Sequence, residues 1–283
     1  MIRKEKNAGK MDSLAEQLCH AGVSSTHATR YLQQVRAFRA QLQTAFAPAD
    51  AARILDALEL MVELHLDQAP RPDGTSYIEH PLAVASQVLE AMAHKDPDVV
   101  VAALLHDAVE DQPARLAHKV RERPARVGKA AAQLALDAIE ERTHSARVRS
   151  LISGLTNPDF DTLVEQRGIQ QGTGDAGQVA LIAARNALYA EHVREAIHDP
   201  DVALIKLFDV AANALTLDAI PDAPTRTRLL NKYTPVIGIM LDRLRETASP
   251  LNIAPHKREE LLARFADALQ TCSRKEGGQE RDR

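Results

Sequence analysis

The sequence predicts an all-α protein, a single-domain helical bundle, and three observations support this fold class. Apolar residues recur at three- and four-residue spacing along nearly the whole chain. The composition favours helix formers, because glycine is sparse, at 12 of 283 residues, while alanine, leucine, arginine and glutamate abound. No segment of useful length alternates between apolar and polar residues in the way that a half-buried strand does. The chain is also long enough to bury a substantial core.

The composition excludes several classes of function. A formal net charge of −4 gives no basic field for DNA or RNA, and 3% aromatic residues without tryptophan argue against a base-stacking surface. No apolar run approaches the roughly 20 residues that a membrane-spanning helix needs, so no membrane partner is expected. Cys19 and Cys272 form neither a disulfide framework nor a metal-ligand pair. Together with a charged N-terminus, this predicts a cytoplasmic protein; no oligomeric state is predicted.

The element boundaries follow from helix breakers and caps. Residues 1–10 and 273–283 are charged and aperiodic, so we expect disordered ends around one helical domain of residues 11–272. A helix is predicted over 50–66, with His65 as a core or near-surface histidine, and it ends at the prolines and glycine of residues 69–74. The next helix begins near Pro81, and Asp96-Pro97 has the pattern of an N-cap followed by proline at the first helical position.

The second half of the chain is again helical in period. Residues 113–150 form helices rich in arginine and lysine, which we expect to be a solvated face, with phosphate contact as the alternative. Residues 157–178 contain one proline and four glycines and are expected to be the least ordered internal stretch, either a lid or a long loop. Further helices are predicted over 178–198, 201–218, 223–247 and 255–270.

The stretch Val99–Asp111 carries the strongest chemical signal. Seven apolar residues lead into adjacent His106 and Asp107, and adjacent Glu110 and Asp111 follow. On a continuous helix, His106 and Glu110 share a face, as do Asp107 and Asp111. Two interpretations are open at this point: a metal site, or a buried helix whose last turn reaches solvent.

Two other segments supply residues that favour the metal site. The segment Gly74–Pro81 contains His80, and the apolar segment Ala203–Leu215 contains Asp209 and Asn213 four residues apart. A buried aspartate needs a partner, and a cation bound by His80, His106 and Asp107 supplies one. Two imidazoles and two carboxylates suit a divalent ion such as Mn²⁺, Fe²⁺, Zn²⁺ or Co²⁺.

These three segments together resemble the HD superfamily of metal-dependent phosphohydrolases, and most closely the hydrolase domain of Rel/Spo-type alarmone enzymes in its stand-alone form. The resemblance rests on the segments Tyr77-Ile-Glu-His-Pro81, Ala102-Ala-Leu-Leu-His-Asp-Ala-Val-Glu-Asp111, and Ile205-Lys-Leu-Phe-Asp209 with Asn213. It covers residues 50–245. Nothing like a nucleotidyl-transfer domain follows, so degradation alone is the expected activity.

The resemblance implies a role for each matching residue. It implies four metal ligands for Mn²⁺, which are His80, His106, Asp107 and Asp209. Glu110 and Asp111 match the acidic pair that orients the attacking water and handles its proton. Arg71 and Asn213 match positions that contact the nucleotide. The implied reaction removes pyrophosphate from the ribose 3′ position of a guanosine or adenosine alarmone such as (p)ppGpp or (p)ppApp.

The chain also departs from the family pattern. Pro72 and Asp73 stand where the family has lysine and serine, and His65 and Gln68 are about one residue out of register before Arg71. In the third segment, family residues are replaced by Phe208, Val210 and Ala212. Two alternatives therefore stay open: an HD phosphohydrolase for another nucleotide, and a helical binding module that has lost catalysis.

Overall fold

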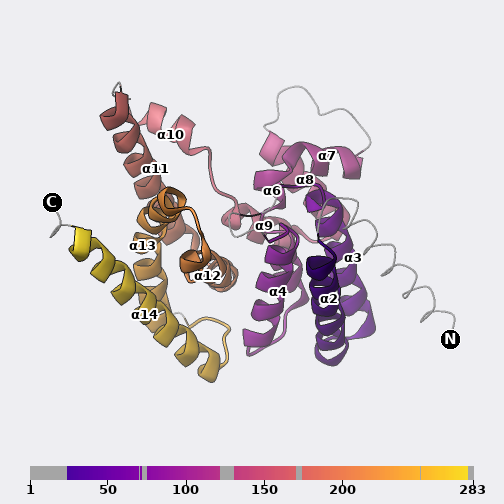
Figure 1. Cartoon of the computed structure of the whole chain (residues 1–283). Coiled ribbons are helices and arrows are strands. Elements are labelled where there is room, and N and C mark those ends of the chain that lie inside the picture. The colour runs from indigo at the N-terminus through magenta and orange to yellow at the C-terminus, as the bar shows by residue number, and fades with distance from the viewer. Residues whose placement is uncertain are drawn as a thin grey trace. The chain divides into compact units, whose positions relative to one another are not determined.

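The computed structural model describes residues 24–69, 71, 75–121, 131–169, 174–248 and 250–279. Every regular element within these ranges is helical, which confirms the predicted all-α fold (Figure 1). None of the helices in these ranges is long and apolar enough to cross a membrane. The predicted disordered segment 1–10 lies outside the described residues. Of the predicted tail 273–283, residues 273–279 belong to the last helix, and the final four residues lie outside the described ranges.

The helices of the chain gather into two compact units. Unit 1 comprises residues 1–90 and 95–150, and unit 2 comprises residues 91–94 and 151–283. One boundary falls inside a helix, between Ser150 and Leu151, so no linker-like composition marks it. Each unit is described separately below.

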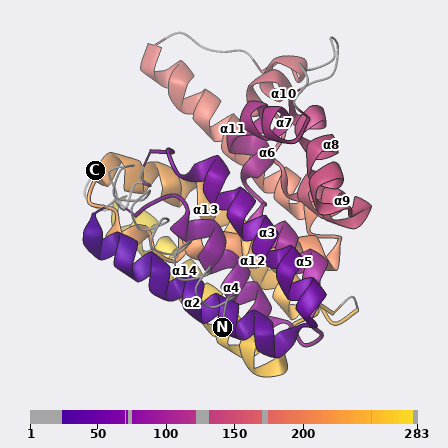
Figure 2. The same cartoon turned by 90° about the vertical axis from the view of Figure 1, so that its right-hand side faces the viewer.

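Among its described residues, unit 1 contains six helices and parts of two more. They are α2 (Ser25–Ala45), α3 (Pro48–His65), most of α4 (Glu79–Ala91), α5 (Pro97–Leu104), α6 (Ala108–Asp111), α7 (Pro113–Arg121), α8 (Ala131–Thr143) and the first half of α9 (Ala146–Leu155). Helix α7 packs against α8 (Figure 1), and helix α3 packs against α2, α6 and α5, the last of which is labelled in Figure 2. The predicted N-cap of α5 is confirmed, because the side chain of Asp96 accepts a hydrogen bond from the Asp98 N–H and Pro97 is the first helical residue.

Unit 2 is built around one long helix, α13 (Ala223–Arg245). This helix packs against α11 (Gly174–Ala196), α12 (Pro200–Ala214) and α14 (Pro255–Gln279) (Figure 2). A 3₁₀ turn, η1 (Leu217–Ala219), follows α12, so the helix predicted over 201–218 is shorter than expected. Helix α10 (Phe160–Gln166) and the start of α11 occupy much of the stretch 157–178, which the sequence predicts to be poorly ordered. Asp159 explains α10, because its side chain caps the helix by accepting from Asp161 N–H and Thr162 N–H.

Candidate metal centre

A break between α5 and α6 places two of the predicted ligands side by side. Helix α5 is buried from Val99 to Leu104, and the chain then leaves helical geometry at Leu105, with φ −107° and ψ 11°. The Leu105 N–H donates to the carbonyls of Val101 and Ala102, and the Ala108 N–H donates to Leu105 O at 3.0 Å. His106 and Asp107 occupy this tight turn. Val99–Asp111 is therefore not one continuous helix, so the shared faces that such a helix would give do not apply, and His106 and Asp107 lie together because they are adjacent in the turn.

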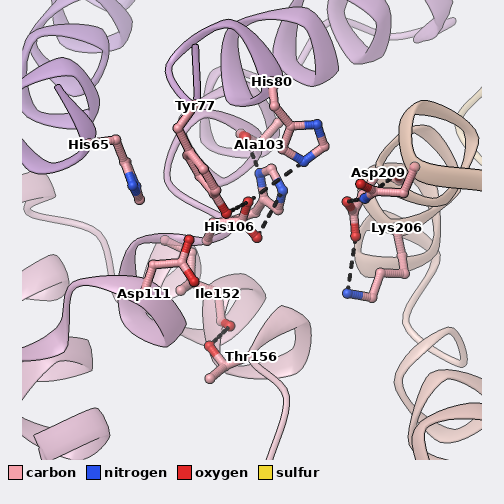
Figure 3. A network of polar contacts seen from close by, with 12 residues as sticks. His65, Tyr77, His80, Ala103, His106, Asp111, Ile152, Thr156, Lys206 and Asp209 are labelled. Carbon is pink, nitrogen blue, oxygen red and sulfur yellow. Dashed lines mark hydrogen bonds and ion pairs between the residues drawn. The ribbon is translucent and has the colours of Figure 1, made fainter. Parts of the chain in front are cut away.

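His80, His106 and Asp107 come together in unit 1. One ligand atom from each lies within 4.8 Å of the others. The distance from His106 Nε2 to Asp107 Oδ1 is 3.2 Å, and that from His80 Nε2 to Asp107 Oδ2 is 3.6 Å. The two imidazole rings meet edge to face with centroids 5.1 Å apart, and both are almost fully buried (Figure 3). Three of the four predicted metal ligands are thus neighbours.

The hydrogen bonding of His106 fits a metal ligand. Its Nδ1 lies 2.9 Å from the carbonyl oxygen of Ala103 (Figure 3). Because a carbonyl only accepts, Nδ1 carries the proton, and Nε2 directs its lone pair toward the Asp107 carboxylate. In the neutral imidazole, the Nε2 lone pair and the Asp107 carboxylate oxygen, 3.2 Å apart, are both suited to coordinate one cation. Two imidazole nitrogens with a carboxylate suit a divalent transition-type ion, and a backbone carbonyl on the opposite ring nitrogen is the usual support for such a ligand.

Tyr77 holds Asp107 from the other side. Its hydroxyl donates a hydrogen bond to Asp107 Oδ2 at 2.9 Å. Burial, followed by the negative charge of Asp107, raises the pKa of Tyr77 well above its ordinary value of 10. The phenol therefore stays protonated and remains a donor throughout the neutral range.

A hydrogen-bonded chain from α3 reaches the predicted catalytic pair, and sequence reasoning missed it. His65 Nδ1 donates to Gln68 Oε1 at 2.7 Å, and Gln68 Nε2 donates to Asp111 Oδ2 at 3.0 Å. The His65 ring also stacks on Tyr77 with centroids 5.1 Å apart (Figure 3). His65 is only 1% exposed, as expected of a core histidine, and burial lowers its pKa. The sequence signal available for this chain was the presence of His65 and Gln68 just before the loop that contains Arg71.

The predicted catalytic residues lie directly after the turn. Glu110 and Asp111 both belong to the four-residue helix α6. Glu110 is half-buried, and Asp111 is exposed while accepting the Gln68 hydrogen bond. The structure thus places Asp111 within the network that also holds His65.

Arg71 lies beside the same aromatic ring. Its guanidinium carbon is 5.9 Å from the centroid of the Tyr77 ring, and its backbone N–H donates to the Thr75 carbonyl oxygen at 2.9 Å. The side chain is half-buried. The substituted positions Pro72 and Asp73 lie outside the described residues.

Asp209 and Asn213 belong to unit 2, on helix α12. Asn213 Nδ2 donates to Asp209 Oδ1 at 2.7 Å, which confirms that the two residues share a helix face. Lys206 Nζ donates to Asp209 Oδ2 at 3.2 Å, and both side chains of this ion pair are buried (Figure 3). The roles predicted for Asp209 and Asn213 stay predictions. The substituted residues Phe208 and Val210 are buried, so these two departures alter the packing of α12.

Comparisons with known proteins agree with the motifs. A family model described as HD domain matches residues 57–236. Two relatives named guanosine-3′,5′-bis(diphosphate) 3′-pyrophosphohydrolase MESH1 match over 64 residues, with 45% identity to the Xenopus tropicalis protein and 41% to the Homo sapiens protein. This segment is 22% of the chain and 36% of each relative. A guanosine-3′,5′-bis(diphosphate) 3′-pyrophosphohydrolase of Haemophilus influenzae is 54% identical over 43 residues, 15% of this chain and 6% of that protein. Because the family model covers more than half of the sequence, the chain belongs to the HD domain family.

Proposed function

We propose that the protein is a Mn²⁺-dependent hydrolase that removes the 3′-pyrophosphate of a guanosine or adenosine alarmone such as (p)ppGpp or (p)ppApp. The observation that carries the proposal is the buried cluster of His80, His106 and Asp107, with Asp111 in the adjoining network. The names of the matching relatives supply the substrate class, since each is called a guanosine-3′,5′-bis(diphosphate) 3′-pyrophosphohydrolase.

Each residue of the cluster has a role in this chemistry. A divalent ion held by His80, His106 and Asp107 would, when bound, polarise a phosphate oxygen and lower the pKa of the attacking water. The Ala103 carbonyl keeps the His106 imidazole in the tautomer that coordinates a metal, and Tyr77 orients the Asp107 carboxylate. Glu110 and Asp111 orient the water and accept its proton, with Gln68 fixing the direction of the Asp111 carboxylate.

Three assignments within the proposal rest on the sequence motif. Asp209 is assigned as the fourth metal ligand, and Arg71 and Asn213 as contacts to the nucleotide. Loss of Mn²⁺ binding in Asp209→Ala, with metal-free folding preserved, is the result that supports the first. A raised KM at unchanged kcat in Arg71→Met or Asn213→Ala supports the other two, because uniform substrate binding is then what was lost.

A substrate screen tests the proposal. The protein is supplied with Mn²⁺ and offered ppGpp, pppGpp, ppApp and ordinary nucleotides, and pyrophosphate release is measured separately from phosphate release. We expect pyrophosphate release from at least one alarmone. Release of inorganic phosphate alone would contradict the proposal and favour an HD phosphohydrolase for another nucleotide. No turnover, together with no Mn²⁺ binding, favours a helical binding module.

Variants separate metal binding from proton handling. We expect Glu110→Gln with Asp111→Asn to lower kcat at least about 100-fold, because general-base catalysis contributes roughly that much. His106→Ala should instead abolish Mn²⁺ binding. The matched control for the double change is Glu165→Gln with Asp175→Asn at exposed positions of unit 2. Full turnover in the first variant would overturn the role of the acidic pair.

A further inference from the structure

The residue immediately before the ligand His80 is a buried carboxylate. Glu79 is the first residue of α4 and is 7% exposed. Its Oε2 accepts hydrogen bonds from Arg30, on α2, through Nε at 3.0 Å and through Nη2. The two residues are 49 positions apart in sequence, so the pair ties α2 to the start of α4. Glu79 is the third residue of the segment Tyr77-Ile-Glu-His-Pro81, and nothing above gives it a role.

The surroundings of Glu79 make Arg30 important to it. A carboxylate removed from water needs a cation or several hydrogen bonds to stay charged. The other carboxylate oxygen, Oε1, is buried and has no hydrogen-bond partner among the residues that the structure describes. The phenol of Tyr31 is also buried, and burial together with the Glu79 charge raises its pKa above the ordinary value of 10. The Arg30 guanidinium, whose side chain is 46% exposed, is the cation that contacts this carboxylate.

The backbone transmits the position of Glu79 to His80. The Glu79 N–H donates to Ser76 O and the His80 N–H donates to Tyr77 O, each at 3.1 Å. These short-range bonds hold both residues in one tight turn at the start of α4. We therefore expect a displacement of Glu79 to alter the direction of the His80 imidazole, whose Nε2 lies 3.6 Å from Asp107 Oδ2.

We propose that Arg30 is a positioning residue for the metal centre: its ion pair with Glu79 fixes the first turn of α4 and so sets the direction from which His80 approaches the ion. Helix α2 precedes the segment 57–236 that the family model matches, so this part of the site lies outside the family core. The inference rests on the metal centre of the proposed function. It adds a determinant of metal affinity that lies on a different helix from every assigned ligand.

Mn²⁺ affinity measured by isothermal titration calorimetry tests the inference. Arg30→Met keeps the aliphatic stem and removes the charge and all donors. We expect it to weaken Mn²⁺ binding about tenfold, the lower end of the range for residues that support metal ligands. Arg30→Lys, which retains the charge but not the side-on geometry, should recover part of the affinity. Arg36→Met, an exposed arginine later on α2, is the control and should bind Mn²⁺ as the wild type does.

A double-mutant cycle separates positioning from plain stability. Glu79→Gln removes the need for a cation, so Arg30→Met should have little further effect on Mn²⁺ affinity in the Glu79→Gln background. Metal-free melting temperatures are measured for every variant. The absorption spectrum of the Co²⁺-loaded protein should also change in Arg30→Met, since it reports ligand geometry. A lower metal-free melting temperature with unchanged Mn²⁺ affinity and unchanged Co²⁺ spectrum overturns the inference.

The experiment distinguishes this inference from the proposed function. If the wild type binds Mn²⁺ and Arg30→Met binds it equally well, the inference is wrong and the metal centre stands. If the wild type binds neither Mn²⁺ nor Co²⁺, the metal centre itself is wrong, and the inference is overturned with it. Should Arg30→Met not fold, Arg30→Lys and Glu79→Gln are compared with the wild type instead. Wild-type Mn²⁺ affinity in both variants would again overturn the inference.

Discussion

Gln68 connects two parts of unit 1 through its side-chain amide. Its oxygen accepts from His65 and from Gln112 Nε2, at 2.7 and 3.2 Å, while its nitrogen donates to Asp111 at 3.0 Å. An amide with both ends engaged has one orientation only. The carboxylate of Asp111 is exposed, so the hydrogen bond from Gln68, together with that from the Tyr77 hydroxyl, gives it a preferred direction.

Replacement of Gln68 by methionine tests that role. The variant keeps the length of the side chain and loses both hydrogen-bonding ends. We expect kcat for pyrophosphate release to fall about tenfold with a small change in KM, because orientation of a catalytic group acts mainly in the transition state. Mn²⁺ affinity should stay within twofold of the wild type.

The control is Gln33→Met, which makes the same change at an exposed position of α2. An unchanged kcat in Gln68→Met would show that Asp111 needs no support from α3, or has no catalytic role. A large loss of Mn²⁺ affinity would instead place Gln68 in support of the metal ligands.

The sequence identified the residues of the cluster more completely than their surroundings. His80, His106 and Asp107 could be predicted because each lies in a motif whose spacing is visible along the chain. Gln68 and Asp111 are 43 residues apart, and a hydrogen bond between them depends on tertiary packing that no local pattern records. The ion pair of Arg30 with Glu79 was not visible for the same reason.

At the level of helices, α9 and α12 approach each other closely within unit 2. A Cβ atom placed on Gly154 would lie 3.0 Å from Val202 Cγ2, tighter than ordinary van der Waals contact. By contrast, a Cβ on Gly238 of α13 would have no atom within 4 Å. The two glycines therefore have opposite relations to their surroundings, although both lie inside helices.

Alanine substitution should separate these two cases. We expect Gly154→Ala to destabilise unit 2 by about 1–3 kcal/mol through overpacking. Gly238→Ala should stabilise it by roughly 0.5–1 kcal/mol, because alanine restricts the unfolded chain without a clash. Denaturant unfolding followed by circular dichroism measures both changes.

Val202→Ala provides the check on the cause. If the contact with the Val202 methyl group is responsible, Gly154→Ala should be much less destabilising in the Val202→Ala background. An equal penalty in both backgrounds would mean that the loss arises elsewhere in α9.

The break between α5 and α6 shows why helix periodicity misplaced one boundary. All residues from Val99 to Leu105 are buried, so the apolar pattern continues across the point where α-helical geometry stops. Periodicity detects which faces of a helix are apolar. A segment that is apolar on every face has no periodic pattern, so no interruption of the pattern can mark the end of the helix. The break was therefore invisible although both flanking elements could be predicted to be helical.

At the scale of the whole molecule, the helices gather into two compact units, and one boundary between these units lies within a helix. The chain passes from unit 1 to unit 2 at Ser150 and Leu151, in the middle of α9. Domain boundaries are read from proline, glycine and polar linkers, and a helix has none of these. The helical class could be predicted from composition and period, whereas the grouping of helices depends on side chains that meet across the fold.

Buried histidines in both units make stability depend on pH. Burial lowers the pKa of His65 in unit 1 and of His192 in unit 2, and the Lys206 ammonium lowers that of His192 further. Each imidazole is thus held neutral in the folded state, and the unfolded chain takes up the proton first as pH falls below the ordinary pKa of 6.5. Stability present above pH 6.5 is therefore lost as pH decreases toward the folded-state pKa, with a slope of at most about 1.4 kcal/mol per pH unit for each group.

Chemical denaturation of the metal-free protein between pH 7.5 and 5.5, values set about one unit either side of the ordinary histidine pKa, measures this dependence. We expect His192→Gln to flatten the pH dependence, because glutamine does not titrate. The slope of stability against pH should fall by less than the limit of about 1.4 kcal/mol per pH unit for one group, since His192 is only half-buried. His198→Gln at an exposed position is the control. A slope unchanged by His192→Gln would mean that this residue titrates as it does in the unfolded chain.

The contact between α2 and α4 has a practical consequence for anyone who trims the gene. An expression boundary drawn from the family match would begin at residue 57 and would omit the whole of α2. The shortened polypeptide would retain every assigned ligand and both acidic residues, yet Glu79 would lose the guanidinium that contacts it. Poor metal loading of such a fragment would then reflect where the cut was made, and would say little about the enzyme from which it came.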